Sequence, residues 1–301
     1  MKASVLLNVA AGSVESGETA GAIARIAEAF RSAGAEAAVR AVDPAGLPAA
    51  AERAASSDAD AVVMGGGDGT LSCAVKALVG GDKPLGILPL GTLNHFARDL
   101  GVPSGLDGAV RTVVAGHVRC VDVGEVNGHL FLNNSSLGIY PEVVRERDEI
   151  HERGAGSRWP ATLRAALAQL RRFPVVSVTL RLPERTLRVT SPLVFVGNNR
   201  YEMKAFAVGR RPEMDRGELW LYVARARSRL GFVGLAGRAL LGRLDPARDF
   251  EWEGLPALEV ATVWRRSLPV ALDGEVMRLA TPLRYRVRPR ALRVLAPPAP
   301  A

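Results

Sequence analysis

Gly65-Gly66-Gly67-Asp68-Gly69-Thr70 is the stretch that decides the fold. It follows the apolar run Ala61-Val62-Val63-Met64, which is typical of a buried parallel strand. After it, apolar residues recur at helical spacing over residues 71–79. A strand, a glycine turn and the start of a helix together aim backbone N–H groups at one point, and this arrangement binds anions.

The side chains of this turn suit a phosphate group. The glycines carry no Cβ, so a phosphate can approach the main chain closely. Thr70 can cap the helix and donate a hydrogen bond to a phosphate oxygen, whereas Asp68 would repel phosphate unless a metal ion or a hydroxyl lay between them. The turn lacks the Lys-Ser/Thr pair of a P-loop and the spacing of a dinucleotide fingerprint. Tight turns between a strand and a helix also favour glycine without any ligand, so the turn alone leaves both interpretations open.

The chain around the turn alternates between strands and helices. Strands are expected over residues 4–9, 37–42, 60–64 and 84–90, and helices over residues 18–33, 46–56, 71–79 and 95–100. This alternation predicts a parallel sheet with helices on both faces. Ligands of such sheets bind beyond the carboxyl ends of the strands. The turns at residues 8–12, 65–70 and 91–94 lie at such ends, so we expect them to converge on a nucleotide site.

The pattern changes after about residue 126. Apolar Val176, Val178 and Leu180 alternate with polar residues, which is the period of a half-buried strand. Strands are expected over residues 129–134, 175–182, 186–197, 219–224, 257–264 and 269–273, helices over 159–172 and 230–244, and turns at 245–248 and 254–256. We therefore predict an α/β domain over residues 1–125, a β-rich antiparallel, sandwich-like domain over 126–284, and a cleft between them. The tail, residues 285–301, is expected to pack back on the first domain.

Composition fits a globular protein of one or two domains, with 301 residues of which 48% are hydrophobic and 23% charged. The net charge of +8 suits an anionic partner such as a nucleotide, a nucleic acid or an anionic membrane surface, and it fits a merely solvated basic surface equally well. Most of this charge is arginine, and Arg284, Arg286, Arg288, Arg290 and Arg293 are expected on one face of a strand. Two cysteines make no disulfide framework. With no signal peptide and no apolar run of about 20 residues, a cytoplasmic location is expected.

Two blocks carry a resemblance to known kinases. Gly66-Gly67-Asp68-Gly69-Thr70 matches the GGDGT signature shared by diacylglycerol, sphingosine and ceramide kinases, NAD kinases and phosphofructokinases. Gly91-Thr92-Leu93-Asn94-His95-Phe96-Ala97-Arg98 resembles the GTxNDFAR block of bacterial diacylglycerol kinases and the wider lipid kinase family, with His95 where Asp is usual. An NAD kinase would instead show an Asn-Gly-rich loop leading into Leu-Gly-Phe-Leu. The chain therefore resembles the lipid kinases related to diacylglycerol and sphingosine kinases.

The resemblance implies ATP and Mg²⁺ as cofactors and a set of residues that bind the nucleotide. The turn Leu7-Asn8-Val9-Ala10-Ala11-Gly12 resembles the family's Asn-Pro-x-x-Gly turn, which cradles ATP phosphates, with Val9 where Pro is usual. The implied nucleotide-binding residues are Asn8, Ala10, Ala11, Gly12, Gly65, Gly66, Gly67, Gly69, Thr70, Gly91, Thr92 and Asn94.

The resemblance also implies a catalytic base. Asp273-Gly274-Glu275 resembles the Asp-Gly-Glu of lipid kinases, whose Glu is taken as the base for the acceptor hydroxyl. The chemistry requires such a group, because an alcohol attacks the γ-phosphate poorly unless its proton has an acceptor. Asp-Gly is equally a common hairpin turn. Glu275 is the predicted base and Asp68 the residue that positions Mg²⁺ and phosphate, with Asp68 as base the alternative. Alanine at either position is expected to abolish transfer and leave the fold intact.

A second metal site is less favoured. Asp215-Arg216-Gly217 falls where relatives show Asp-Asp-Gly, which in some binds a structural Mg²⁺. A cation at position 216 disfavours this auxiliary site at Asp215, and the arginine can replace the ion by pairing with nearby carboxylates.

The resulting prediction is a lipid kinase that transfers the γ-phosphoryl group of ATP to a lipid hydroxyl, with a diacylglycerol-like or sphingoid acceptor. Its substrate would be presented at a membrane surface, with peripheral contact at the inner face of the membrane and no nucleic acid partner. Two alternatives remain: a kinase of a soluble acceptor, similar to NAD kinase, and a catalytically inactive protein that binds lipid or nucleotide. His95 and Arg216 are the features that favour the inactive protein. The sequence leaves the oligomeric state open.

Overall fold

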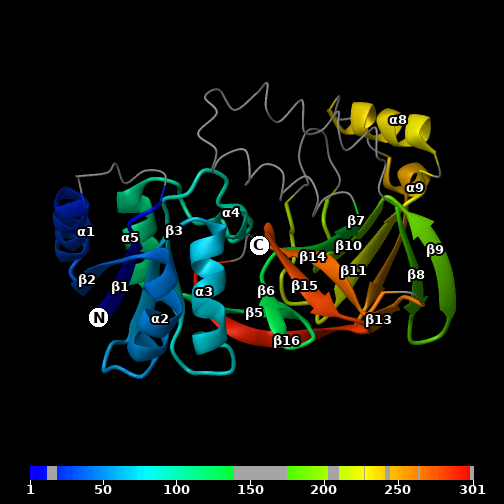
Figure 1. The fold of residues 1–301 in the computed structure, drawn as a ribbon. Helices are drawn as coiled ribbons and strands as arrows, with labels where there is room; N and C mark the ends of the chain where they lie inside the picture. Colours follow the sequence, from blue (N-terminus) through cyan, green and yellow to red (C-terminus); the bar gives the residue numbers. More distant parts are fainter. Residues whose placement is uncertain are drawn as a thin grey trace. The chain divides into compact units, whose positions relative to one another are not determined.

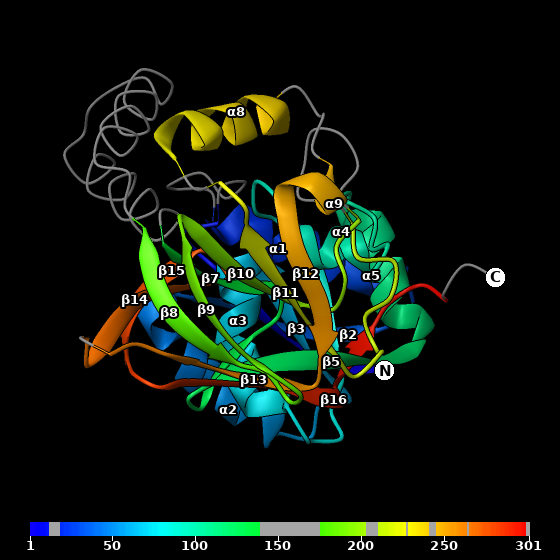
Figure 2. The same ribbon diagram turned by 90° about the vertical axis from the view of Figure 1, so that its right-hand side faces the viewer.

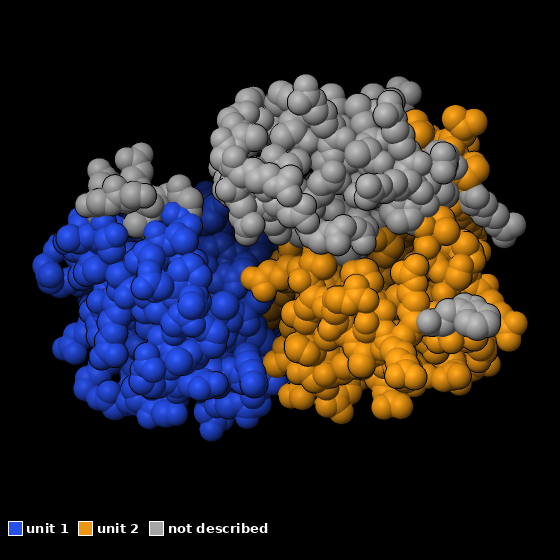
Figure 3. Space-filling view, in the orientation of Figure 1, with its two compact units in different colours: residues 1–123, 289–301 blue, residues 124–288 orange. Residues whose placement is uncertain are grey.

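The structure is a computed structural model that describes residues 1–11, 19–138, 175–202, 210–226, 228–240, 245–263 and 265–298 (Figure 1). The chain forms two compact units. Unit 1 contains residues 1–123 and 289–301, and unit 2 contains residues 124–288 (Figure 3). The chain passes between them within strand β5 (Val118–Val126) and again within strand β16 (Leu283–Leu295). The sequence placed these divisions after residues 125 and 284.

Unit 1 is built on a parallel sheet. Its strands are β1 (Lys2–Asn8), β2 (Glu36–Val42), β3 (Ala61–Gly66), β4 (Leu85–Pro89) and the end of β16. Their order is β2-β1-β3-β4-β16, and each neighbouring pair is parallel. Every residue of β3 is buried, because this strand lies in the middle of the sheet with helices on either side. The predicted parallel sheet is confirmed.

Helices cover both faces of this sheet. They are α1 (Thr19–Ser32), α2 (Leu47–Ala55), α3 (Asp68–Leu78), α4 (His95–Asp99) and α5 (Leu106–Ala115), with a short 3₁₀ turn, η1 (Pro44–Gly46), before α2. Helix α2 packs on α3, and α1 packs on α5. Helix α1 buries Ala22, Ile26 and Phe30, which recur every fourth residue and so share one face.

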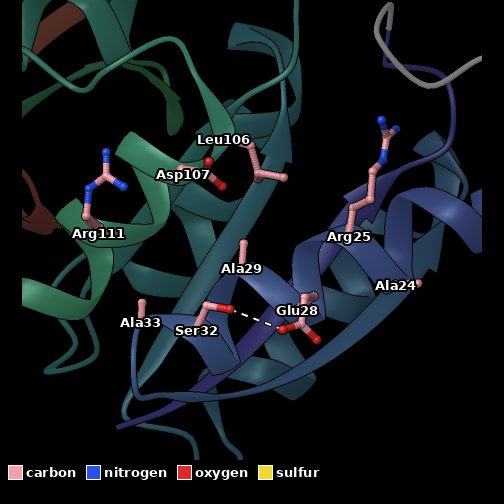
Figure 4. A pocket seen from close by; sticks show the side chains of 9 residues that line it. All are labelled: Ala24, Arg25, Glu28, Ala29, Ser32, Ala33, Leu106, Asp107 and Arg111. Carbon is pink, nitrogen blue, oxygen red and sulfur yellow. Dashed lines mark hydrogen bonds between the residues drawn. The ribbon is translucent and has the colours of Figure 1, made fainter.

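A groove of about 750 Å³ lies between α1 and α5 (Figure 4). Its charged lining residues are Arg25, Glu28, Asp107 and Arg111, and a Glu28 carboxylate oxygen accepts a hydrogen bond from the Ser32 hydroxyl at 3.1 Å. None of the predicted site residues lines this groove.

Unit 2 is a sandwich of antiparallel sheets (Figure 2). One sheet has the order β12-β11-β10-β7-β14-β15, and the other runs β16-β13-β8-β9, with β5 beside β16 and β6 beside β5. Each ladder between these strands for which pairing is resolved is antiparallel. Leu180, Val194 and Val270 of the two sheets are fully buried in one shared core, which confirms the predicted sandwich. The strands are β6 (His129–Phe131), β7 (Asn134–Gly138), β8 (Val176–Arg181), β9 (Thr186–Ser191), β10 (Leu193–Asn198), β11 (Leu219–Ala224), β12 (Phe250–Leu255), β13 (Ala257–Ala261), β14 (Ser267–Leu272) and β15 (Glu275–Ala280).

Two helices belong to unit 2, α8 (Arg229–Leu240) and α9 (Pro246–Asp249). Leu235 of α8 packs with Tyr222 of β11 and Phe250 of β12, outside the sandwich core. The Arg238 guanidinium of α8 pairs with the buried Asp249 carboxylate of α9 at 2.5 Å. The helix predicted over residues 159–172 lies outside the described residues.

Several predicted element boundaries were wrong in unit 2. The strand predicted over residues 186–197 is two strands in different sheets, because β9 pairs with β8 whereas β10 pairs with β7 and β11. They separate at Pro192, which has no N–H to donate to a ladder. The strand predicted over residues 129–134 likewise divides into β6 and β7. Gly254 and Leu255, predicted to form a turn, end strand β12.

The arginines of β16 do not all share one face. Arg284 is exposed between the buried Leu283 and Tyr285, and Arg286 is exposed after Tyr285. The buried positions then shift by one residue after Arg290, whose φ is +49°. Arg286 and Arg288 both donate hydrogen bonds to the buried carboxylate of Glu125. Burial raises the pKa of Glu125, but the hydrogen bonds from the two arginines outweigh this effect and leave the pKa below its ordinary value.

Candidate active site

The glycine turn of unit 1 leads directly into a helix. Strand β3 ends at Gly66, Gly67 takes an extended conformation as the N-cap, and helix α3 begins at Asp68. The helix therefore starts three residues earlier than the sequence predicted. The first N–H groups of a helix have no acceptor within the helix, and here they lie at the carboxyl end of a central parallel strand. This is the geometry of an anion site.

The glycines also allow two loops to approach closely. A Cβ at Gly91 would lie 2.4 Å from the Cα of Gly67, so a side chain at Gly91 would push the loop after β4 away from the loop after β3. A Cβ at Gly66 would lie 2.3 Å from the Thr70 hydroxyl oxygen. The sequence explained these glycines by the approach of phosphate, and the structure adds the contact between the two loops as a second reason.

Asn8 connects the end of β1 to the start of α3. Its Nδ2 donates to the Thr70 hydroxyl at 2.8 Å, and its Oδ1 accepts from the Ala10 N–H at 2.9 Å. Thr70 is 4% exposed, so its hydroxyl is held within this contact. Ala11 is buried beside the turn, and the predicted ligand Gly12 lies outside the described residues.

Asp68 holds the N-terminus of the next helix. Its Oδ2 accepts from the His95 N–H at 3.0 Å and its Oδ1 from the Phe96 N–H at 2.9 Å. Both N–H groups belong to the first turn of α4, so the Asp68 side chain caps that helix from a distance of 27 and 28 residues along the chain. The sequence did not predict this role.

Asn94 shapes the loop between β4 and α4. It adopts a left-handed conformation, with φ and ψ both 48°. Its Oδ1 accepts from the Gly91 N–H at 3.1 Å, and its Nδ2 donates to the Gly91 carbonyl at 2.7 Å. The loop is thereby closed on itself, with Thr92 exposed at its outer side. The His95 ring Nδ1 accepts from Arg98 Nη2 at 2.9 Å, so the residue that departs from the family block bonds within its own helix.

Asp273 and Gly274 form the two-residue turn between β14 and β15. Their φ angles are +48° and +91°, which are typical of a type I′ hairpin turn. The Asp273 carboxylate also accepts three backbone N–H groups, from Leu132 at 2.8 Å, Asn133 at 2.7 Å and Asn134 at 3.1 Å. Glu275 follows as the first residue of β15 and is exposed. The hairpin interpretation of Asp-Gly is thus correct for the backbone, and the carboxylate adds an anchor.

Arg216 pairs with a neighbouring carboxylate. Its Nε donates to Glu213 Oε2 at 2.6 Å and its Nη2 to Glu213 Oε1 at 2.5 Å. These hydrogen bonds lower the pKa of Glu213. Asp215 is exposed beside them. Among the described residues, no group of three or more His, Cys, Asp or Glu side chains is placed to hold a metal ion. A metal at Asp215 stays a prediction.

The structure thus brings the predicted residues together in two groups. Asn8, Gly67, Asp68, Thr70 and Gly91 are linked by contacts within unit 1. Glu275 and Asp215 belong to unit 2. Sequence reasoning missed Arg211, which is 1% exposed and bonds to the segment that holds Asp273. Arg211 lies beside Pro212 in a polar stretch, and nothing in this local sequence indicates that its side chain is buried.

Comparison with known proteins bears on this geometry. The model of the diacylglycerol kinase catalytic domain matches residues 2–126. A protein of Pseudomonas fluorescens described as a probable YegS-like lipid kinase is 32% identical over 78% of this chain and 77% of its own length. A relative from Pseudomonas aeruginosa with the same description is 31% identical over 82% and 80%. This chain belongs to the diacylglycerol kinase-like family of lipid kinases.

Solved structures of similar fold align with nearly the full length of this chain. The crystal structure of a diacylglycerol kinase from Bacillus anthracis superposes with a TM-score of 0.71 at 21% identity, covering 99% of this chain and 97% of that one. Another structure from the same organism gives a TM-score of 0.77 at 22% identity, covering 99% and 96%. In the described part of this lipid kinase, no helix has both the length and the hydropathy to cross a bilayer.

Proposed function

We propose that this member of the lipid kinase family transfers the γ-phosphoryl group of ATP to a hydroxyl group of a lipid, with Mg²⁺ bound to the nucleotide. The observation that carries the proposal is the convergence of three loops on the N-terminus of α3. Asn8 bonds to Thr70, Gly91 contacts Gly67, and Asp68 caps α4. Phosphoryl transfer depends mainly on positioning and charge neutralisation, which such a rigid frame of N–H groups provides.

The residues of unit 1 fit the phosphates of a nucleotide. The N–H groups at the start of α3 and the exposed hydroxyl of Thr92 are suitable donors to phosphate oxygens. Mg²⁺, when bound, would neutralise charge on the phosphates. In this proposal the ion arrives bound to ATP. Among the described residues, no group of three or more Asp, Glu, His or Cys side chains is placed to hold it. Asp68, at the start of α3, is the residue that would position Mg²⁺ and the phosphates.

Glu275 is the proposed proton acceptor. Its side chain is exposed at the start of β15, and the backbone before it is fixed by the Asp273–Gly274 turn. Both oxygens of Asp68, the other candidate, already accept backbone N–H groups. In the proposed step the lipid hydroxyl oxygen bonds to the γ-phosphorus, the bond from phosphorus to the β,γ-bridging oxygen breaks, ADP leaves, and the hydroxyl proton passes to Glu275. A lipid acceptor lies in a membrane, so the proposed site of action is a membrane surface.

A labelling experiment tests the proposal. The purified chain is incubated with γ-labelled ATP, Mg²⁺ and detergent micelles that contain diacylglycerol, a sphingoid base or ceramide, and separately with NAD without lipid. We expect label in one lipid class. We expect Glu275→Gln to lower kcat by about 10²- to 10⁴-fold, with ATP binding unchanged, because a positioned base contributes this much. Glu184→Gln, in the exposed turn between β8 and β9, is the matched control and should keep full activity.

Other outcomes would redirect the assignment. Label in NAD alone would identify a kinase of a soluble acceptor. Binding of ATP without transfer to any acceptor would identify a non-catalytic protein. Full turnover by Glu275→Gln would remove Glu275 from the role of base.

A further inference from the structure

Residues 132–134 run from the end of β6 into the first residue of β7, and distant parts of unit 2 form hydrogen bonds with this segment. On one side, its three successive N–H groups donate to the Asp273 carboxylate at 2.7 to 3.1 Å. The Asp273 N–H donates in return to the Asn134 carbonyl at 2.9 Å. The turn that precedes Glu275 is therefore fixed to this segment by four hydrogen bonds, which we call the Asp273 anchor.

Arg211 bonds to the same segment. Its side chain is 1% exposed, and Nη1 donates to the Leu132 carbonyl at 2.6 Å and to the Asn198 carbonyl at 3.0 Å. Its Nη2 donates to Asn133 Oδ1 at 2.7 Å. The guanidinium carbon also lies 5.4 Å from the centre of the Tyr201 ring, within reach of a cation–π interaction.

Further bonds to the segment come from Asn198 and Tyr201. The Leu132 carbonyl accepts from Asn198 Nδ2 at 2.9 Å in addition to Arg211. The Asn133 carbonyl accepts from the Tyr201 hydroxyl at 3.0 Å and from the Asn198 N–H at 2.9 Å. Irregular backbone that is buried must satisfy its polar groups with such partners, so its position depends on them.

We propose that Arg211 is a positioning residue for the reaction, which acts through the segment 132–134 and the Asp273 anchor to fix Glu275. The inference rests on the proposed function, because it assigns Arg211 a role toward the proposed base. Burying a guanidinium costs free energy unless its donors are bonded. Here the guanidinium donates to the segment that holds the turn before Glu275. The buried arginine therefore helps to fix the position of that turn.

The geometry requires arginine. A planar guanidinium reaches the Leu132 carbonyl, the Asn198 carbonyl and Asn133 Oδ1 at once, whereas an ammonium group is a point charge without that fork. Arg211→Lys should therefore retain part of the wild-type behaviour that Arg211→Met loses. Arg238→Met is the matched control. It removes the ion pair with the buried Asp249 carboxylate in the same unit, and no hydrogen bond from Arg238 to residues 132–134 is found among the described residues.

The test combines amide exchange with kinetics. In folded Arg211→Met we expect exchange at Leu132, Asn133 and Asn134 to accelerate about tenfold or more, as expected when a buried charged hydrogen bond is lost. With saturating ATP we expect kcat for the lipid to fall about 100-fold with KM little changed, since displacement of a catalytic group by about 1 Å has this effect. Arg238→Met should lose as much thermal stability as Arg211→Met, but its amide exchange at residues 132–134 and its kcat should stay as in the wild type.

Each result has a defined meaning. Unchanged exchange at residues 132–134, or unchanged kcat, in folded Arg211→Met would overturn the proposal. If that variant does not fold, Tyr201→Phe removes one bond to the same segment and keeps the ring, so it should show the same changes at smaller size. If it shows neither change, the proposal is wrong. Absence of turnover in the wild-type protein would instead refute the proposed function. Exchange in the variants would then still decide whether Arg211 holds the Asp273 anchor.

Discussion

Replacement of Asp68 tests whether this carboxylate is a helix cap or the catalytic base. The carboxylate accepts the N–H of His95 at 3.0 Å and that of Phe96 at 2.9 Å. Asp68→Ala leaves both groups without this partner at a half-buried helix end, where loss of a cap typically costs about 1–2 kcal/mol. Free-energy changes of this size alter an equilibrium roughly 5- to 30-fold. Exchange of the two amides should accelerate by this factor, and Asp68→Asn, which keeps one acceptor oxygen, should show a smaller acceleration.

The assay is site-resolved amide hydrogen exchange on the wild-type protein and both variants. Asp107→Ala is the matched control, since it removes a first-turn carboxylate from α5 and should leave the α4 amides unchanged. Unchanged exchange at His95 and Phe96 in Asp68→Ala would refute the capping role. The same variants distinguish the role of Asp68 as a helix cap from a role as the catalytic base. If Asp68 only positions the loop, Asp68→Asn should retain part of the turnover, whereas a base would lose turnover equally in both variants.

Two further substitutions follow from the geometry. Gly91→Ala places a Cβ 2.4 Å from the Cα of Gly67, so we expect a loss of about 1–3 kcal/mol in unfolding free energy and weaker ATP binding, measured by denaturation and by calorimetry. The pKa of Glu125 lies below its ordinary value of 4.5, because the hydrogen bonds from Arg286 and Arg288 outweigh the effect of burial. Its contribution to stability is therefore present above pH 4.5 and lost as the pH falls through the lowered pKa, and Glu125→Gln should remove that part of the pH dependence.

Each of these substitutions has a control in the same unit. Gly21 lies inside helix α1 with open space around its Cβ position, so Gly21→Ala should not destabilise the protein. A Gly91→Ala variant as stable as Gly21→Ala would contradict the close contact of the two loops. For Glu125, the exposed Glu184→Gln should leave the pH dependence as in the wild type. An identical curve for Glu125→Gln would show that the pair with the arginines does not contribute.

The sequence predicted the parts of the fold that depend on local pattern. The strand before Gly65 and the helix after it follow from the spacing of apolar residues, which neighbouring positions along the chain set by themselves. The alternation of Val176, Val178 and Leu180 predicted strand β8 for the same reason. The division of residues 186–197 into β9 and β10 was not predictable in this way, because it depends on which strand each one pairs with.

The same distinction applies to the candidate site. Residue types and spacing predicted that the loops at Asn8, Gly67 and Gly91 belong to one site, because carboxyl ends of parallel strands meet at one edge. The partners of individual side chains were not predictable. Arg211 is an example, since its buried bonds join residues that the sequence separates widely.

The sequence by itself therefore determined the class of the protein, the glycine turn that begins α3 and the hairpin turn before Glu275, because backbone preferences act over a few residues. The tertiary structure decided what the carboxylates do. Asp68 caps a helix 27 residues further along the chain, and Asp273 accepts an N–H from Leu132 across a separation of 141 residues. Such hydrogen bonds form only when packing of the hydrophobic core brings distant segments together, and local spacing carries no information about that.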